Sequence, residues 1–401
     1  MGRTRSAAPA RPVLLATAIV LVAINLRASI TAVGPIVSDI RADLGLSSAS
    51  AGLLTTLPVL AFALASPLAG PLSRRVGIER TLAGALVLLL GGILVRVAGP
   101  TWAAFAGTAL LGIAIAAGNV LLPSLVTRDL PKRMGPVTSL YVTVMVSFAG
   151  IASTISVPLA DDAGLGWRGA LAVWAGPVAV GLVIWLPRAA RSGPREVRPG
   201  GEREVRPTRM RRSAIAWQVT AYMGLQSFAF YVLVAWLPVL LEDDGVSATT
   251  AGALMGVMQA ASLVATIAVP VLATRATHQR WLVLVSSALG VFAAGGLVVA
   301  PGDLALLWTV TVGVAGGSTL SLALAFFVLR TRDGADAAAL SGMAQSLGYG
   351  FAAAGPFVIG ALHDATDGWT VPAVVLLADW VLILVAGLAA GRRRVAAEPR
   401  R

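Results

Sequence analysis

Long apolar segments recur along this chain and restrict its possible folds more than any other feature. A helix needs about 17–25 residues to cross a ~30 Å hydrocarbon layer. The sequence is 57% apolar and 12% charged, whereas a soluble domain carries about 25% charged residues. We therefore predict an all-α membrane protein with twelve transmembrane helices near residues 13–37, 48–71, 80–99, 101–126, 135–158, 169–187, 214–241, 248–272, 281–300, 303–329, 338–361 and 370–390.

Charged residues alternate between the two ends of these segments. Basic residues follow the second, fourth, eighth and tenth segments and fill the C-terminal tail, while acidic residues dominate the intervening loops. Because Lys and Arg are enriched in cytoplasmic loops, we expect both termini in the cytoplasm. The chain is then a multi-pass protein of the cytoplasmic (inner) membrane, with the lipid bilayer as a partner.

One long polar stretch divides the chain. Residues 188–213 hold nine arginines interspersed with Pro and Gly. A solvated linker that also fixes topology is the simpler interpretation, and contact with anionic lipid is the functional alternative. The predicted parts are an N-terminal six-helix bundle at 1–187, a cytoplasmic Arg-rich linker at 188–213 and a C-terminal six-helix bundle at 214–401.

Short motifs recur between the two parts at a spacing of about 200 positions, which indicates an internal repeat. The matches are 50–54 with 250–254, Arg128-Asp129 with Arg332-Asp333, Ser139 with Ser341, and Gly166-Trp167 with Gly368-Trp369. Two parallel six-helix repeats of this kind are the plan of a major-facilitator transporter.

The composition also excludes several classes of site. The chain has no cysteine, and its two histidines, His278 and His363, fall in predicted loops. No Walker loop is present, so ATP does not drive the protein directly. The net charge of +12 follows membrane topology, which argues against nucleic acid as a partner. We expect no catalytic residue, no metal site, no cofactor and no enzyme activity.

Arg27 lies inside the first apolar segment, where a charged side chain is costly. No acid lies on the same segment within helical reach until Asp39. Such residues usually face a polar cavity or a partner. We therefore take Arg27 as a substrate-binding candidate. The structural alternatives are an ion pair with a distant acid, or snorkelling to a lipid headgroup.

The segment 70–80 (GPLSRRVGIER) separates the second and third predicted helices. It resembles the loop signature of major-facilitator transporters, in which glycines allow a tight turn and basic residues line the cytoplasmic surface. The resemblance implies a conformational role for Gly70, Arg74, Arg75, Gly77 and Arg80. Arg74 stands where that signature has an aspartate, and we expect Glu79 to supply the acid instead.

Further motifs sharpen the resemblance over nearly the whole chain. They are Asn25-Leu26-Arg27, 51–58 (AGLLTTLP), 118–123 (GNVLLP), 345–349 (QSLGY) and 355–364 (GPFVIGALHD). Together they resemble the cyanate and 2-nitroimidazole transporter family of the major facilitators. This implies a twelve-helix secondary transporter of a small solute that works by alternating access.

Polar residues within apolar helices mark the expected cavity. We select Asn25 beside Arg27, Asn119, Gln226, Tyr231 and Gln345 as substrate-binding candidates. By resemblance, helices one, four, seven and ten line the cavity, which favours Asn119 and Gln226. The alternative for each is an ordinary interhelical hydrogen bond.

Gly355 and Pro356 interrupt the eleventh segment with a helix-breaking pair, so we predict a hinge there, with static packing of small residues as the alternative.

The sequence thus predicts a monomeric secondary active transporter of a small, anionic or polar planar solute. A multidrug or metabolite exporter of the same fold is one alternative. A membrane sensor or enzyme without transport is the alternative from another class.

Overall fold

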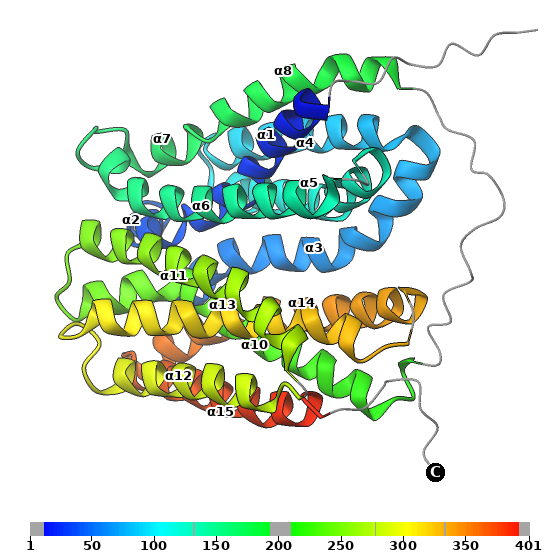
Figure 1. The fold of residues 1–401 in the computed structure, drawn as a ribbon. Coiled ribbons are helices and arrows are strands. Elements are labelled where there is room, and N and C mark those ends of the chain that lie inside the picture. The colour runs from blue at the N-terminus through cyan, green and yellow to red at the C-terminus, as the bar shows by residue number, and fades with distance from the viewer. Residues whose placement is uncertain (1–11, 131–132, 193–209, 277, 333, 393–401) are drawn as a thin grey trace, which may run out of the picture.

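The computed structural model describes residues 12–130, 133–192, 210–276, 278–332 and 334–392, and these ranges contain helices and no β-strand (Figure 1). The elements are α1 (Pro12–Thr31), η1 (Gly34–Ile36), α2 (Val37–Leu44), α3 (Ser48–Val76), α4 (Ile78–Arg96), α5 (Thr101–Asp129), α6 (Met134–Ala160), α7 (Gly166–Ala172), α8 (Ala175–Arg191), α10 (Ala214–Asp243), α11 (Ala248–Arg275), α12 (Arg280–Val299), α13 (Ala305–Leu329), α14 (Gly334–Thr366) and α15 (Thr370–Ala390).

Eleven helical segments in the described ranges are long and apolar enough to cross a membrane. The 33-residue α14 is also long enough to cross, and it packs between α3 and α10, so the predicted number of twelve is reached. Successive membrane-crossing helices run in opposite directions between two ends of the molecule (Figure 1). We call the end where α8 stops and α10 starts the linker end, and the opposite end, which holds α2 and α7, the distal end (Figure 1).

Several predicted boundaries shift. The first predicted span is broken after Thr31, where η1 and α2 follow, and the sixth is divided into α7 and α8. α3 continues to Val76, so Gly70 lies within a helix and only Gly77, with φ of +95°, makes the turn. α8 continues to Arg191, into the predicted linker. Residues 193–209, most of that linker, lie outside the described ranges.

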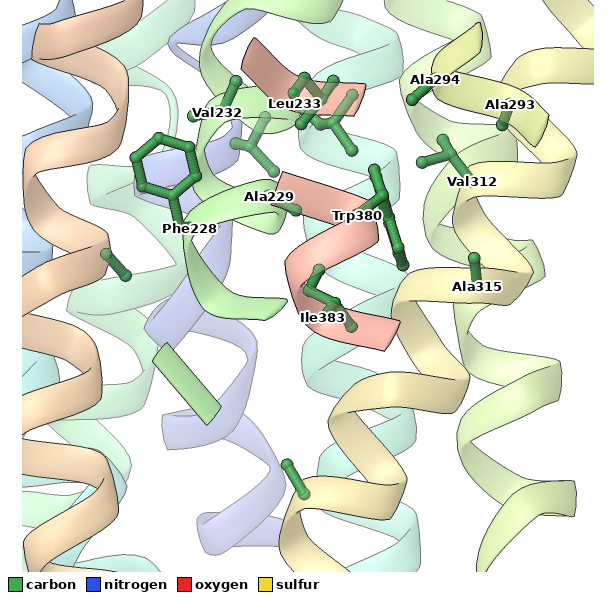
Figure 2. Packing of buried hydrophobic residues seen from close by; sticks show 14 of the residues in the cluster. Phe228, Ala229, Val232, Leu233, Ala293, Ala294, Val312, Ala315, Trp380 and Ile383 are labelled. Carbon is green, nitrogen blue, oxygen red and sulfur yellow. The ribbon is translucent and has the colours of Figure 1, made fainter. Parts of the chain in front are cut away.

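Two hydrophobic cores hold the helices together. One is built largely from α1 to α8, which we call the N-half, and the other largely from α10 to α15, the C-half. In the C-half core, Trp380 and Ile383 of α15 face Val312 and Ala315 of α13 (Figure 2). Each half therefore buries its own apolar surface.

Helices at matching places of the two halves begin in the same way. The Ser47 hydroxyl accepts the Ser50 N–H at 3.2 Å at the start of α3, and the Ser247 hydroxyl accepts the Thr250 N–H at 3.3 Å at the start of α11. A serine before the first turn satisfies a backbone donor that has no partner within the helix. The repeated 50–54 and 250–254 motifs are thus repeated helix starts.

Matching tryptophans fasten the distal end of each half. Trp167 Nε1 donates to Asp43 Oδ2 at 3.1 Å, and Trp369 Nε1 donates to Asp243 Oδ2 at 2.6 Å. The Gly-Trp match in the sequence therefore corresponds to a repeated hydrogen bond.

A second repeated contact occurs at the linker end. Arg128 of α5 forms an ion pair with Glu79 at the start of α4, and Arg330 after α13 bonds to the Gln279 side chain before α12. Arg128 matches Arg332 in the sequence repeat, but Arg330 makes the corresponding contact. Because Gln279 is uncharged, only the N-half contact is an ion pair.

Candidate functional site

Small residues let the two halves approach closely in their distal parts. A methyl group built on Gly52 of α3 would lie 2.4 Å from the Pro356 carbonyl oxygen of α14, which no real side chain tolerates. On the other side of the molecule, a methyl group on Gly252 of α11 would lie 3.1 Å from the Ser153 oxygen of α6. Glycine is therefore required where α3 meets α14 and is tightly constrained where α11 meets α6.

Polar contacts also join α3 to α14 at the distal end. The Asp364 carboxylate accepts the Ser48 and Ala49 N–H groups at 3.2 and 2.9 Å, and the Ser48 hydroxyl lies 3.2 Å from His363 Nδ1. A carboxylate at a helix N-terminus is favoured by the helix dipole and by the free N–H groups there. We call this contact of residues 48, 49, 363 and 364 the distal latch. The sequence shows these residues, but nothing in it pairs positions so far apart.

Arg27 lies between the two halves. It is the only charged residue of α1, its side chain is half-buried, and its Cζ lies 5.2 Å from the centre of the Phe230 ring on α10. No acidic side chain in the described ranges forms an ion pair with it. Its guanidinium group is permanently charged, and a cation over an aromatic face is only partly compensated. Arg27 can therefore take a further anionic or polar partner.

Four half-buried aromatic side chains extend from Arg27 across the junction. Phe230 and Tyr231 of α10 have ring centres 5.2 Å apart, and Tyr231 lies 6.4 Å from Tyr349 of α14. Tyr349 in turn lies 4.9 Å from Phe62 of α3, edge to face. We call Arg27 and these four residues the central site. Phe62 and Tyr349 were not among the predicted candidates.

Two predicted amides adjoin the central site. Gly118 of α5 packs directly on Leu26, so Asn119 lies at the depth of Arg27, and it is half-buried. Asn119 Nδ2 donates to the Ile115 oxygen of its own helix at 3.1 Å. Gln345 is half-buried one turn from Tyr349, and its Nε2 donates to the Ser341 hydroxyl at 2.7 Å. Each amide keeps some hydrogen-bonding capacity.

The other two predicted amides lie elsewhere. Asn25 is 1% exposed, and its Nδ2 donates to Leu21 O at 2.8 Å and to Pro177 O of α8 at 3.4 Å, so it packs within the N-half. Gln226 is also buried, and its Nε2 donates to the Ser227 hydroxyl at 2.7 Å. It lines a small cavity inside the C-half. Asn25 therefore lies away from the central site, whereas Gln226 reaches it only through this cavity, which Phe230 also lines.

The sequence matches the family model of the Major Facilitator Superfamily over residues 19–356. The chain belongs to the Major Facilitator Superfamily. It is 39% identical to the 2-nitroimidazole transporter of Escherichia coli (strain K12), with 95% of this chain and 96% of that protein covered. It is 28% identical to the cyanate transport protein CynX of the same organism, with 92% and 94% covered. The predicted resemblance is confirmed, and the protein is a multi-pass membrane transporter.

A solved transporter structure has the same fold. The crystal structure of a bacterial homologue of the human lysosomal transporter Spinster, inward-facing and unoccupied, aligns with a TM-score of 0.77 and 15% identity. The alignment covers 96% of this chain and 98% of that one. The predicted all-α major-facilitator fold is therefore confirmed.

The superfamily loop signature has one deeply embedded residue in this chain. Glu79 bonds to Arg128 and lies 3.5 Å from Arg188 of α8, so it joins α4, α5 and α8. Hydrogen bonds to Asp129 and then to Glu79 raise the pKa of Arg128 above its ordinary value, although burial opposes them. Glu79 thus joins three helices of the N-half, and its acidic role in the signature stays a prediction.

The basic residues of the signature lie on the surface. Arg75 and Arg80 are exposed at the linker end, and the side chain of Arg74 lies outside the described part of the chain. Their conformational role stays a prediction.

Gly355 and Pro356 lie where α14 packs against neighbouring helices. A methyl group on Gly355 would lie 3.0 Å from both Phe228 and Val232, and the Pro356 oxygen accepts the Trp236 indole N–H at 2.8 Å. The pair thus fixes close packing in the distal half of α14. Whether it also acts as a hinge stays a prediction.

Proposed function

We propose that this chain is a secondary active transporter of a small anionic or polar planar solute, which Arg27 binds at the junction of the two halves. The observation that carries the proposal is the environment of Arg27: a permanent charge within a membrane-spanning helix, over the Phe230 ring and without an acidic partner in the described ranges. Intramembrane charges of this kind usually serve function. A solute with a negative or strongly polar group supplies the missing partner.

The relatives' names support this class of solute. Cyanate is a small anion, and 2-nitroimidazole is a planar ring with a polar nitro group. A fixed positive charge binds an anion such as cyanate. A positive charge among aromatic side chains suits both cyanate and 2-nitroimidazole, because planar groups stack on or pack edge-to-face with aromatic rings. Asn119 and Gln345 add directional hydrogen bonds at the margin of the site.

The contacts between the halves support alternating access. The distal latch and the glycine contacts join α3 to α14 and α6 to α11 in their distal parts, which corresponds to a state closed at the distal end. In this proposal the bundles 1–187 and 214–401 rock about the central site, and Gly355 and Pro356 let α14 bend. The signature residues Gly70, Arg74, Arg75, Gly77 and Arg80 act at the linker end during this motion.

The same proposal fixes orientation and partners. The linker end, with its many arginines, faces the cytoplasm together with both termini, and the membrane is the cytoplasmic membrane. The protein works as a monomer, binds no nucleic acid and moves its solute unchanged rather than acting as an enzyme.

Solute counterflow in proteoliposomes tests the proposal. Vesicles loaded with unlabelled cyanate or 2-nitroimidazole should accumulate the labelled compound when they contain the protein, and protein-free vesicles should not. Arg212→Gln removes an exposed arginine outside the site and serves as the control variant, with wild-type exchange expected. Absence of exchange and of binding for both compounds would contradict the proposed solute class.

A further inference from the structure

A small cavity in the C-half is lined by residues of α10, α11, α13 and α15. Its polar lining consists of Gln226, Gln259, Ser262 and Trp380. Trp380 projects from α15 into the space between α10 and α13 (Figure 2). The cavity thus shares Phe230 with the central site, and its lining comes from helices of one half only.

Two of the lining side chains carry hydrogen-bond donors that nothing in the described ranges accepts. Gln259 is 2% exposed and Trp380 is 1% exposed, and neither Gln259 Nε2 nor Trp380 Nε1 has a partner. Buried polar groups are almost always paired, so two unpaired donors around one cavity need an explanation. An indole N–H can only donate, which means that the missing partner is an acceptor.

The cavity has a volume of about 20 Å³, which is room for one small group, and it has a connection to the central site. A methyl group built on Gly316 of α13 meets no atom within 4 Å, which leaves open space on that wall. Phe230 lines the cavity and also carries Arg27 over its ring. Phe230 is therefore common to this cavity and to the contact with Arg27.

We propose that this cavity is a second subsite, which takes the hydrogen-bond-accepting group of a planar-ring solute, such as a nitro or carbonyl group. This inference rests on the proposed function and extends it. Gln259 and Trp380 donate to the acceptor, while Phe230 and Arg27 hold the rest of the solute. A triatomic anion such as cyanate is too short to use both places and binds at Arg27 alone.

Binding of 2-nitroimidazole and of cyanate to the purified protein tests the subsite. Trp380→Phe keeps the ring and removes the donor, and Gly316→Val fills the open space. Trp380→Phe should weaken 2-nitroimidazole binding by about 5- to 100-fold, the range for losing a buried hydrogen bond. Gly316→Val should also weaken it, because the accepting group is excluded from the cavity. Both variants should leave cyanate binding unchanged. The controls are Trp281→Phe, an exposed tryptophan, and Gly295→Val, a glycine with nothing within 4 Å, both on α12.

The outcomes separate this inference from the proposed function. If both cavity variants bind 2-nitroimidazole as the wild type does, the cavity holds only water and the subsite is wrong, while the role of Arg27 stands. If they lose both compounds equally at unchanged thermal stability, the cavity is not selective and the inference fails. If the wild type binds neither compound, the proposed function fails and the subsite with it.

Discussion

Two asparagines of the N-half differ in what their amides contact. We therefore predict different effects when each is replaced by alanine. Asn25 bridges α1 to the Pro177 oxygen of α8, whereas the bond of Asn119 within the described ranges goes to its own helix. Asn25→Ala should lower stability by roughly 0.5–1.5 kcal/mol, a typical net hydrogen bond, and leave solute affinity unchanged. Asn119→Ala should lower solute affinity and leave stability unchanged. Thermal unfolding and binding measured on the same samples check both, and a loss of affinity in folded Asn25→Ala would return Asn25 to the site.

The sequence finds such residues but cannot say which way they face. Asn25, Asn119 and Gln226 look alike as polar residues in apolar helices, and only the packing of neighbouring helices separates them. Arg96 is a further example. Its position near a helix end suggests a side chain that snorkels to the lipid headgroups. It is instead 3% exposed, and its NH1 group donates to the Ser29 oxygen of α1 at 2.7 Å. Arg27 could be predicted because a charged residue within an apolar segment is unusual whatever its neighbours in the fold are.

At the scale of elements, α3 and α14 make the contact on which the closed distal end depends. Gly52 of α3 lies on the Pro356 oxygen, Gly360 of α14 lies on the Ser48 oxygen, and Asp364 caps α3. The length of the apolar segment predicts α14 as a helix. It does not predict the contacts of α14, because the partners on α3 lie some 300 positions earlier in the chain.

Gly52→Val should force α3 and α14 apart and shift the protein toward a distal-open state. The reason is steric, since a Cβ atom there lies 2.4 Å from backbone oxygen, and backbone cannot move aside as a flexible side chain can. The chain has no cysteine, so spin labels attach only at cysteines that are introduced. Ala163→Cys and Asp303→Cys place them at exposed positions in the distal loops of the two halves.

The distance between these labels should increase in Gly52→Val. The control is Gly84→Val on α4, where a Cβ meets no atom within 4 Å and the distance should stay as in the wild type. An unchanged distance in folded Gly52→Val would show that this contact does not hold the distal end closed.

At the scale of the whole molecule, composition and repetition predicted the all-α fold and the superfamily. Apolar segments set the number of spans, and repeated motifs marked repeated helix starts and the tryptophan contacts of the distal ends. The breaks between α1 and α2 and between α7 and α8 were missed, because their residues stay apolar through the break. Hydrophobicity indicates which residues are surrounded by lipid or protein. It does not indicate where the backbone hydrogen bonding of a helix is interrupted.

Orientation follows from the charge pattern and has a direct test. A fluorescent protein that folds only in the cytoplasm, fused after residue 401, should fluoresce in cells, because the basic linker end faces inward. The same domain inserted in the distal loop at 161–165 should stay dark at equal expression. The opposite result would reverse the proposed topology.

Affinity of the purified Arg27→Gln variant tests the central claim most directly, with Arg27→Lys and the control Arg212→Gln beside it. Loss of a charge-assisted bond of roughly 1.5–3 kcal/mol should weaken cyanate binding by about 10- to 150-fold in Arg27→Gln. Arg27→Lys should recover only part of this loss, because lysine keeps the charge but not the planar pair of donors. Folded yield should be maintained, since removing an unpaired charge lowers the insertion cost. Wild-type affinity in folded Arg27→Gln would contradict the account, because Arg27 would then not be the partner of the solute.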